Sequence, residues 1–180
     1  MDAMQQLVAR SELRDLVCRY AIAVDSRDID TLVGLYWPDD ETCPPDDYRR
    51  RLRSRFDGSL AGIGVSFMNV GTHVVDDLTG SSATGQTYCR SEFAFGGRWT
   101  HQAILYRDRY VRVDSRWHFH GERGHQLFYG APHGVDPLLL PPVTHRRDRT
   151  GMGEVPGTWP SWAAFWNRLD IPDDGKTAGP

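Results

Sequence analysis

The sequence has few cysteines, a small net charge and no long hydrophobic run. Its three cysteines, Cys18, Cys43 and Cys89, are an odd number without paired spacing, which argues against a disulfide framework and favours the cytoplasm. The formal net charge of −3 gives no general reason to expect a nucleic acid or an anionic membrane as a partner. No apolar run approaches the ~20 residues of a membrane span, and the N-terminus lacks a signal-peptide core. We therefore expect a cytoplasmic protein that binds neither nucleic acid nor membrane.

The first third of the chain has helical periodicity. Apolar residues recur every three or four positions from Leu13 to Val24, as on one buried face of a helix. Asp28 is placed to cap a short second helix, which must end before Pro38. A third helix is expected over residues 46–56.

Downstream, the hydrophobic period changes from 3.6 to 2. Four β-rich runs, at residues 64–78, 83–95, 98–113 and 116–129, are separated by short turn sequences, so consecutive strands should be antiparallel neighbours. Strands longer than ~12 residues usually curve, and the helices would fill the hollow. We predict an α+β domain over residues 1–130. A Pro- and Gly-rich arm with a short helix would follow over residues 131–180.

One imidazole stands out in the first predicted strand. Alternate residues of a strand share a face, so Phe67, Asn69 and His73 would point into the hollow together. Asp25 follows Ala21 by four positions, which places a carboxylate at the end of the buried helical stripe, where it needs a partner. We predict that Asp25 orients His73 as a general base. The plainer alternative is a core histidine satisfied by a carboxylate.

The segments LRDLVCRYAIAVDSRDIDTLVGLY, THVV and RWHFHGER resemble the SnoaL-like branch of the nuclear transport factor 2-like superfamily. Within it the chain is most similar to the scytalone and bile-acid dehydratases and the hexachlorocyclohexane dehydrohalogenases. The resemblance covers residues 7–129 and implies a cone-shaped α+β barrel with a curved antiparallel sheet around three helices. It also implies a homodimer or homotrimer, with Asp25 and His73 at catalytic positions.

Four further residues are candidates for the same cavity. Tyr20 matches a tyrosine of related dehydratases, and His101 resembles a second histidine of scytalone dehydratase, so both would assist departure of a hydroxyl group. Their alternatives are a core aromatic and a rim histidine. Trp117 and Arg123 share a face of the last predicted strand, where Arg123 would bind an oxyanion or a carboxylate.

These residues predict a cofactor-independent dehydratase, a lyase that removes water from a hydrophobic polycyclic, polyketide-like or steroid-like substrate. Two alternatives stay open. The same Asp25–His73 pair would serve a polyketide cyclase or an isomerase, and the fold also suits a non-catalytic small-molecule binding protein.

Two other readings receive less support. His118, His120 and Glu122 alternate on one face and could bind iron, manganese or zinc, but that face is opposite Trp117, so we predict no metal. The stretch RRRLRSR is flanked by acidic residues, which favours a solvated helix face over a site for an anionic substrate carrier.

Overall fold

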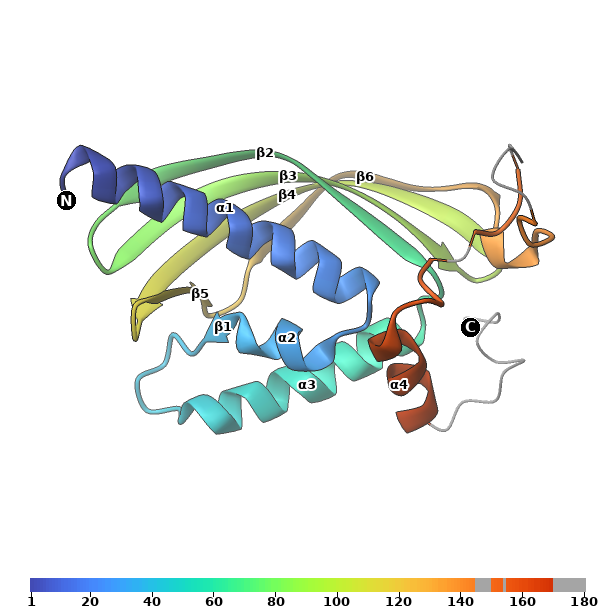
Figure 1. The fold of residues 1–180 in the computed structure, drawn as a ribbon, viewed down its shortest axis with the longest axis horizontal. Helices are drawn as coiled ribbons and strands as arrows, with labels where there is room; N and C mark the ends of the chain where they lie inside the picture. The colour runs from blue at the N-terminus through green and yellow to red at the C-terminus, as the bar shows by residue number, and fades with distance from the viewer. Residues whose placement is uncertain (145–149, 154, 170–180) are drawn as a thin grey trace.

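The computed structural model describes residues 1–144, 150–153 and 155–169. Helices lie beneath one face of a long curved sheet (Figure 1). The helices are α1 (Ala3–Asp25), α2 (Ile29–Gly34), α3 (Pro45–Ala61) and α4 (Pro160–Arg168). The strands are β1 (Tyr36–Trp37), β2 (Ser66–Leu78), β3 (Ser82–Phe95), β4 (Arg98–Val113), β5 (Arg116–His120) and β6 (Gly124–Val135). A 3₁₀ turn, η1 (Pro137–Leu139), follows β6.

The helices begin where local capping satisfies their first backbone N–H groups. Helix α1 starts ten residues before the predicted apolar stripe because Asp2 and Gln5 form a capping box at its N-terminus. Asp28 caps α2 as predicted, and its carboxylate accepts a hydrogen bond from the Thr31 N–H.

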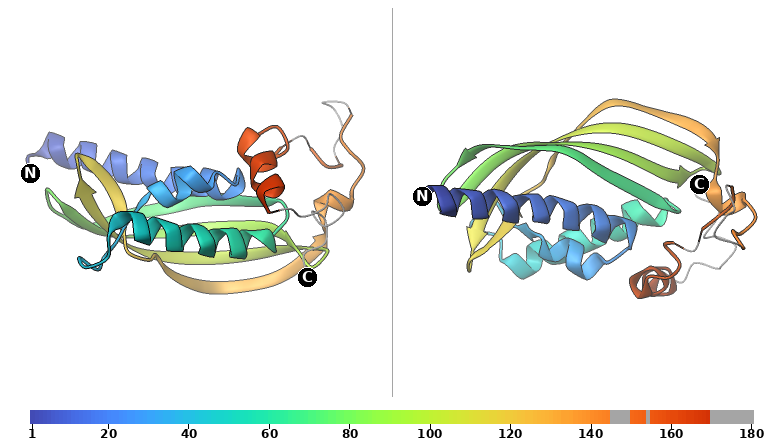
Figure 2. Two further views of the ribbon diagram at one scale, coloured as in Figure 1. Left: turned by 90° about the horizontal axis from the view of Figure 1, so that it is seen from below. Right: turned by 45° about the horizontal axis from the view of Figure 1, so that its top comes forward.

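The sheet has the order β1-β5-β4-β3-β2, with β6 also paired to β4. All neighbours are antiparallel except the two-residue β1, which runs parallel to β5. Figure 2 shows that the sheet arches over α1, α2 and α3 without closing on itself. The α+β prediction with a curved sheet around three helices is confirmed, and the sheet is open and mixed.

The run predicted over residues 116–129 is two strands. β5 pairs with residues 110–113 of β4, whereas β6 pairs with residues 98–107. The strand is interrupted at Gly121, which has a φ of +72°. A Cβ at this position would lie 2.5 Å from the Asp39 carboxyl group. Only glycine suits such a position. The break matters because Arg123 lies in the segment between the two strands.

Strand β2 contains a β-bulge. Val70 pairs with Cys89 and His73 pairs with Thr87, so three steps along β2 match two steps along β3. The extra residue reverses the side-chain alternation. Positions on either side of the bulge therefore cannot share a face by simple parity.

Because of the bulge, the side chains predicted to point into the hollow with His73 do not do so. Phe67 is 56% exposed and Asn69 is also exposed, both on the outer face, whereas Ser66 and Met68 point toward the helices and line the cavity there. Beyond the bulge, Val75 is buried and His73 is half-buried. Periodicity without the bulge wrongly placed Phe67 and Asn69 beside His73.

The C-terminal helix α4 docks on its own chain, against α1 and α3. Phe165 and Trp166 are each 2% exposed. The Ser161 hydroxyl donates to the Ser26 carbonyl at 2.7 Å, and Arg168 forms an ion pair with Asp57. These contacts give a short helix the tertiary support that it needs in water.

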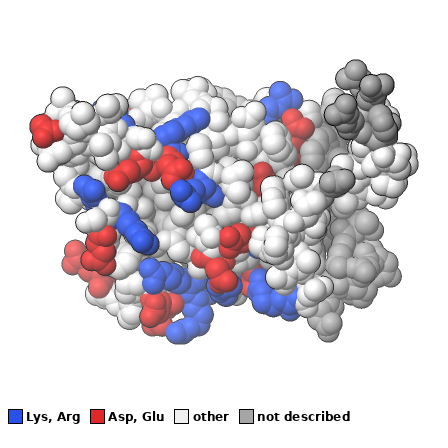
Figure 3. Space-filling model, in the orientation of Figure 1, with Lys and Arg blue, Asp and Glu red and all other residues white. Residues whose placement is uncertain are grey.

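Helix α3 carries the arginine-rich stretch on an exposed, charge-paired surface. Arg49 pairs with Asp46 and Arg50 with Asp47. Figure 3 shows acidic and basic side chains alternating over this region. The solvated-helix interpretation fits these pairs. Across the described residues, no helix is long and apolar enough to cross a membrane.

Candidate functional site

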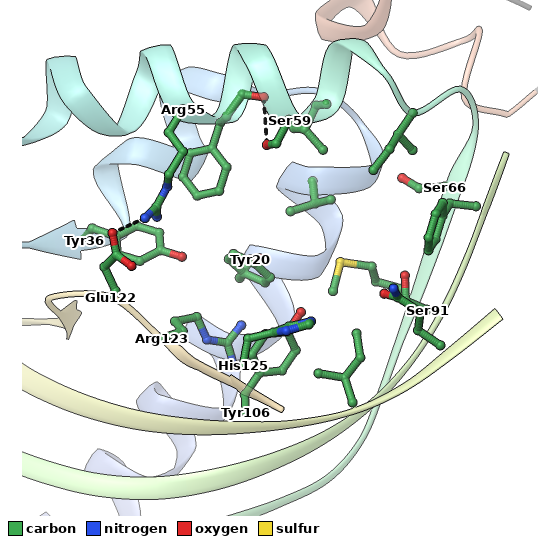
Figure 4. Close-up of a pocket in the computed structure, with 18 residues that line it drawn as sticks. Tyr20, Tyr36, Arg55, Ser59, Ser66, Ser91, Tyr106, Glu122, Arg123 and His125 are labelled. Carbon is green, nitrogen blue, oxygen red and sulfur yellow. Dashed lines mark hydrogen bonds and ion pairs between the residues drawn. The ribbon is translucent and has the colours of Figure 1, made fainter. Parts of the chain in front are cut away.

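A cavity of about 490 Å³ lies between α3, α1 and the concave face of the sheet (Figure 4). This volume is in the range of small-molecule sites. Apolar side chains that include Val24, Leu60, Met68 and Ile104 line one part of it. Polar groups line the part around Arg123, so the cavity combines an apolar bed with a concentrated polar corner.

Arg123 lies against three aromatic rings. Its guanidinium carbon is 3.9 Å from the ring centroid of Tyr106 and 4.4 Å from those of Tyr20 and Phe119. Cation–π contacts of this kind stabilise a desolvated cation. The side chain is only 4% exposed, so the rings fix the guanidinium at the wall of the cavity.

Asp108 holds the other edge of the guanidinium. Arg123 Nε donates to Oδ1 at 2.7 Å and Nη2 donates to Oδ2 at 2.8 Å. Burial by itself lowers the pKa of Arg123, but the hydrogen bonds and charge of Asp108 outweigh burial and raise it. The remaining nitrogen, Nη1, has no hydrogen-bond partner in the described part of the chain, and it can donate to a molecule in the cavity.

Three tyrosines add neutral hydroxyl groups to this corner. Burial raises the pKa of Tyr20, Tyr36 and Tyr106, so each keeps its proton near neutral pH. All three line the cavity, and Tyr20 makes edge contacts with the rings of Tyr36 and Tyr106. The predicted placement of Tyr20 and Arg123 in one cavity is therefore seen in the structure.

His125 supplies an imidazole at the mouth of the cavity. It follows Arg123 by two positions, lines the cavity and makes an edge contact with the Tyr106 ring, with centroids 5.5 Å apart. Figure 4 shows His125 beside Arg123 and Tyr106. Among the described residues that line the cavity it is the only histidine.

Asp25 is buried behind the cavity wall, with partners other than the predicted one. Its carboxylate accepts hydrogen bonds from Ser66 Oγ and from the Met68 N–H, both at 2.8 Å. Burial raises its pKa from 3.8 to about 6, although both hydrogen bonds and the nearby Arg27 oppose that shift.

His73 lies farther along β2 and contacts Tyr110. Its Nε2 is 3.2 Å from the Tyr110 hydroxyl, and burial lowers the pKa of the imidazole, helped by Arg14. Five residue steps along β2, about 16 Å, separate His73 from Met68, which Asp25 contacts. The structure therefore does not bring Asp25 and His73 into the predicted hydrogen bond.

The remaining predicted residues lie outside the cavity. His101 points away from the helices and packs against the His133 ring, with centroids 4.4 Å apart. It pairs with Glu92 across the outer face. Trp117 is buried beside the middle of α1, where it lines a separate cavity with Glu12 and Arg19. Its strand, β5, ends before the chain turns toward Arg123, so sharing a parity with Arg123 did not place it in the same cavity.

Several residues of the site were not predicted from the sequence: the cavity-lining His125, Tyr36 and Tyr106, and the buried Asp108 and Tyr110. Asp108 and Tyr110 alternate with Tyr106 on the inward face of β4, and both are buried. The Tyr110 hydroxyl donates to Asp108 at 3.2 Å. The signal was present in the sequence as a carboxylate between two aromatic residues of an alternating strand, a position where an unpaired charge would be costly.

His118 and Glu122, which were considered together as metal ligands, contact different neighbours. His118 packs against the Trp37 ring, and Glu122 forms an ion pair with Arg55. Within the described ranges, no three His, Cys, Asp or Glu side chains are grouped so that they could hold a metal ion.

Comparisons with known proteins agree with this architecture. Residues 5–122 match the SnoaL-like domain family. A hexachlorocyclohexane dehydrochlorinase structure has a TM-score of 0.62 at 16% identity, with 75% of this chain and 96% of that chain covered. A putative scytalone dehydratase from Novosphingobium aromaticivorans has a TM-score of 0.61 at 14% identity, with the same coverage. At such identities the structural likeness concerns the fold.

No curated protein matches the sequence. A putative aromatic ring hydroxylase from Novosphingobium aromaticivorans also shares the fold, with a TM-score of 0.59 at 19% identity over 69% of this chain and 92% of that chain. The family match spans well over half of the chain and includes most of the elements that enclose the cavity, whereas Arg123 and His125 follow directly after it. This protein belongs to the SnoaL-like domain family.

Proposed function

We propose that this protein is a cofactor-independent lyase that eliminates water from a hydrophobic small molecule held beneath the sheet. The observation that carries the proposal is the convergence of Arg123 Nη1, neutral tyrosine hydroxyls and His125 on one corner of a largely apolar cavity. Dehydratases and dehydrochlorinases are among the proteins that share the fold. A polycyclic, polyketide-like or steroid-like skeleton with a carbonyl group and a β-hydroxyl group suits this arrangement.

The proposed reaction proceeds through an enolate. His125 removes a proton from the carbon that lies between the carbonyl group and the carbon that bears the hydroxyl group. The electron pair moves to the carbonyl oxygen, where Arg123 Nη1 donates a hydrogen bond to the developing negative charge. When the enolate collapses, the carbon–hydroxyl bond breaks and an alkene forms. The His125 imidazolium returns its proton to the departing hydroxide, so that water leaves and the enzyme is regenerated.

Tyr20 assists in this proposal, whereas Asp25 has a supporting role. The Tyr20 hydroxyl is a second donor for the carbonyl oxygen or the leaving hydroxyl. Asp25 fixes Ser66 and Met68 at the cavity wall through its two hydrogen bonds. His125 replaces His73 as the proposed base because it lines the cavity.

A panel of polycyclic β-hydroxy ketones tests the proposal. Mass spectrometry of the products would detect the loss of one water molecule. The wild-type protein should convert at least one member, and Arg123→Gln should lower kcat by roughly 10²-fold because it removes the oxyanion donor. His101→Ala is the matched control, since it removes an outer-face side chain and should keep full turnover. Equal turnover of wild type and Arg123→Gln would contradict the proposed mechanism.

A second candidate is a cyclase or an isomerase that uses the same cavity. The observation that favours it is the single imidazole among the described lining residues, since one base can remove a proton and return it to another carbon. Product mass separates the two activities, because isomerisation retains the water that elimination removes. Binding of the ketones without any conversion would indicate a non-catalytic binding protein.

We further propose that the chain forms a homodimer or homotrimer through the outer face of the sheet. Phe67, Tyr88 and Phe128 are each more than half exposed there, and the rings of Tyr88 and Phe128 are in edge contact. Exposed aromatic clusters are typical of interfaces. Cys18, Cys43 and Cys89 are free thiols, which supports a cytoplasmic location for the assembly.

A further inference from the structure

We infer that Asp108 makes the cavity selective for neutral carbonyl compounds over carboxylates, because it neutralises Arg123 and occupies one bidentate edge of its guanidinium. This inference rests on the proposed function only for the carbonyl group, and it names the substrate class of the same cavity. Asp108 is thereby a specificity-determining residue that acts through Arg123 without contacting the ligand.

Asp108 already occupies one edge of the Arg123 guanidinium. An arginine binds a carboxylate most strongly with two parallel N–H donors. In Arg123 the pair formed by Nε and Nη2 is already engaged by the two oxygens of Asp108, at 2.7 and 2.8 Å. Nη1 and the second N–H of Nη2 are left to donate toward the cavity. A ligand there meets a guanidinium whose Nε–Nη2 edge is already used, and Nη1 suits a single carbonyl or hydroxyl oxygen.

The charges of Asp108 and Arg123 offset each other in this corner of the cavity. The Asp108 side chain is fully buried and the Arg123 side chain is 4% exposed, so little water screens one from the other. Their opposite charges cancel at hydrogen-bond distance. A ligand carboxylate would thus lose its hydration without gaining a net positive partner, and this loss is costly in a buried site.

The Asp108 carboxylate is held in place by several hydrogen bonds. Besides Arg123, its Oδ2 accepts hydrogen bonds from Tyr110 at 3.2 Å and from Thr87 Oγ1 at 3.4 Å. The Tyr110 hydroxyl in turn contacts His73. These donors hold the carboxylate in place, so a ligand cannot displace it from Arg123 by a simple side-chain rotation.

The other charges of the cavity do not replace the missing positive partner. Arg55 is paired with Glu122 at the mouth, and their side chains are 43% and 71% exposed. Behind the wall, Asp25 lies near Arg27. The cation and carboxylate of each pair cancel, which leaves a cavity without an excess of either sign.

The test compares two ligands of one skeleton, 2-acetylnaphthalene and 2-naphthoate, by isothermal titration calorimetry at neutral pH. The wild-type protein should bind the ketone more tightly. Asp108→Asn keeps the size of the side chain but removes its charge, so it should shift the preference toward the carboxylate by roughly tenfold or more. Glu122→Gln removes the same charge at the exposed mouth, and its shift should be less than about threefold.

Three outcomes would overturn the inference. The wild-type protein would bind the carboxylate more tightly, it would bind neither probe, or Asp108→Asn would leave the ratio of the two affinities unchanged. The wild-type ratio decides the question even if Asp108→Asn fails to fold. Preference for the ketone without turnover of any β-hydroxy ketone would instead contradict the proposed lyase activity and leave this inference intact.

Discussion

The Nε2 atom of His73 lies 3.2 Å from the Tyr110 hydroxyl, and Tyr110 donates to Asp108. Through these two residues His73 is connected to Arg123. The histidine that the sequence singles out as a base therefore supports, from one side, the carboxylate that fixes Arg123 in the cavity. Its position in this chain of contacts explains why it is half-buried without lining the cavity itself.

Replacement of Asp108 by alanine tests the importance of this connection for stability. It would leave the Arg123 guanidinium buried without its carboxylate, at a cost of about 3–5 kcal/mol in the free energy of unfolding. Urea denaturation measures the change. Asp76→Ala, at an exposed carboxylate on β2, should change stability by less than about 0.5 kcal/mol. Similar small effects of both substitutions would contradict the assigned role of the ion pair.

The raised pKa of Asp25 predicts that the stability of the protein depends on pH. Its pKa is raised from 3.8 to about 6 in the folded protein, so between these values the folded state holds more protons than the unfolded state. The free energy of unfolding should therefore fall as pH rises through this window, by up to about 3 kcal/mol from this group. Below the window both states are protonated, and the contribution is fully present.

The Asp25→Asn variant isolates that contribution because asparagine does not titrate. Urea denaturation of both proteins from about pH 4 to pH 7 gives the difference in their unfolding free energies. We expect the wild type to lose stability relative to the variant across this range. A constant difference would show that Asp25 ionises at its ordinary pKa, and the opposite slope would show a lowered pKa; either result would contradict the prediction.

The docking of helix α4 predicts that replacement of one aromatic residue, Phe165, strongly lowers the stability of the protein. Phe165 is 2% exposed and lies near the buried Arg27 guanidinium, at 5.9 Å. Phe165→Ala should lower the free energy of unfolding by about 3–5 kcal/mol, since it leaves a cavity between α4 and α1. Leu139→Ala, at a residue 60% exposed, is the control and should have little effect. Equal stability of all three proteins would show that α4 contributes no packing energy.

The exposed aromatic cluster on the outer face of the sheet is the predicted site of self-association. Phe128→Glu would place a charge within the aromatic cluster and should convert the oligomer to monomers in light-scattering measurements. Ile22→Glu adds the same charge at an exposed residue of α1 and should leave the oligomer intact. A monomeric wild-type protein, or an oligomeric Phe128→Glu variant, would rule out this interface.

Much of the architecture could be predicted because it depends on local patterns. The stripe from Leu13 to Val24 faces the core, and the alternating runs became β2, β3 and β4. Asp28 is a helix cap for a purely local reason, since its side chain reaches an N–H three residues away. Such signals survive in a single sequence.

The site was harder to predict because it depends on two local irregularities. The extra residue in β2 moves Phe67 and Asn69 to the outer face, and the turn at Gly121 separates Arg123 from the strand that carries Trp117. Neither feature alters the hydrophobic pattern on which strand prediction depends. The partners of Asp25 include a backbone N–H, which no pattern of side chains reveals.

The central question is whether proton transfer occurs at His125 or at His73. The direct measurement is the turnover number of His125→Ala and His73→Ala on a β-hydroxy ketone that the wild-type protein dehydrates. We predict a loss of roughly 10²–10⁴-fold for His125→Ala. For His73→Ala the loss should be less than about tenfold, because that residue acts through Tyr110 and Asp108. Full activity of His125→Ala together with an inactive, folded His73→Ala would contradict the account.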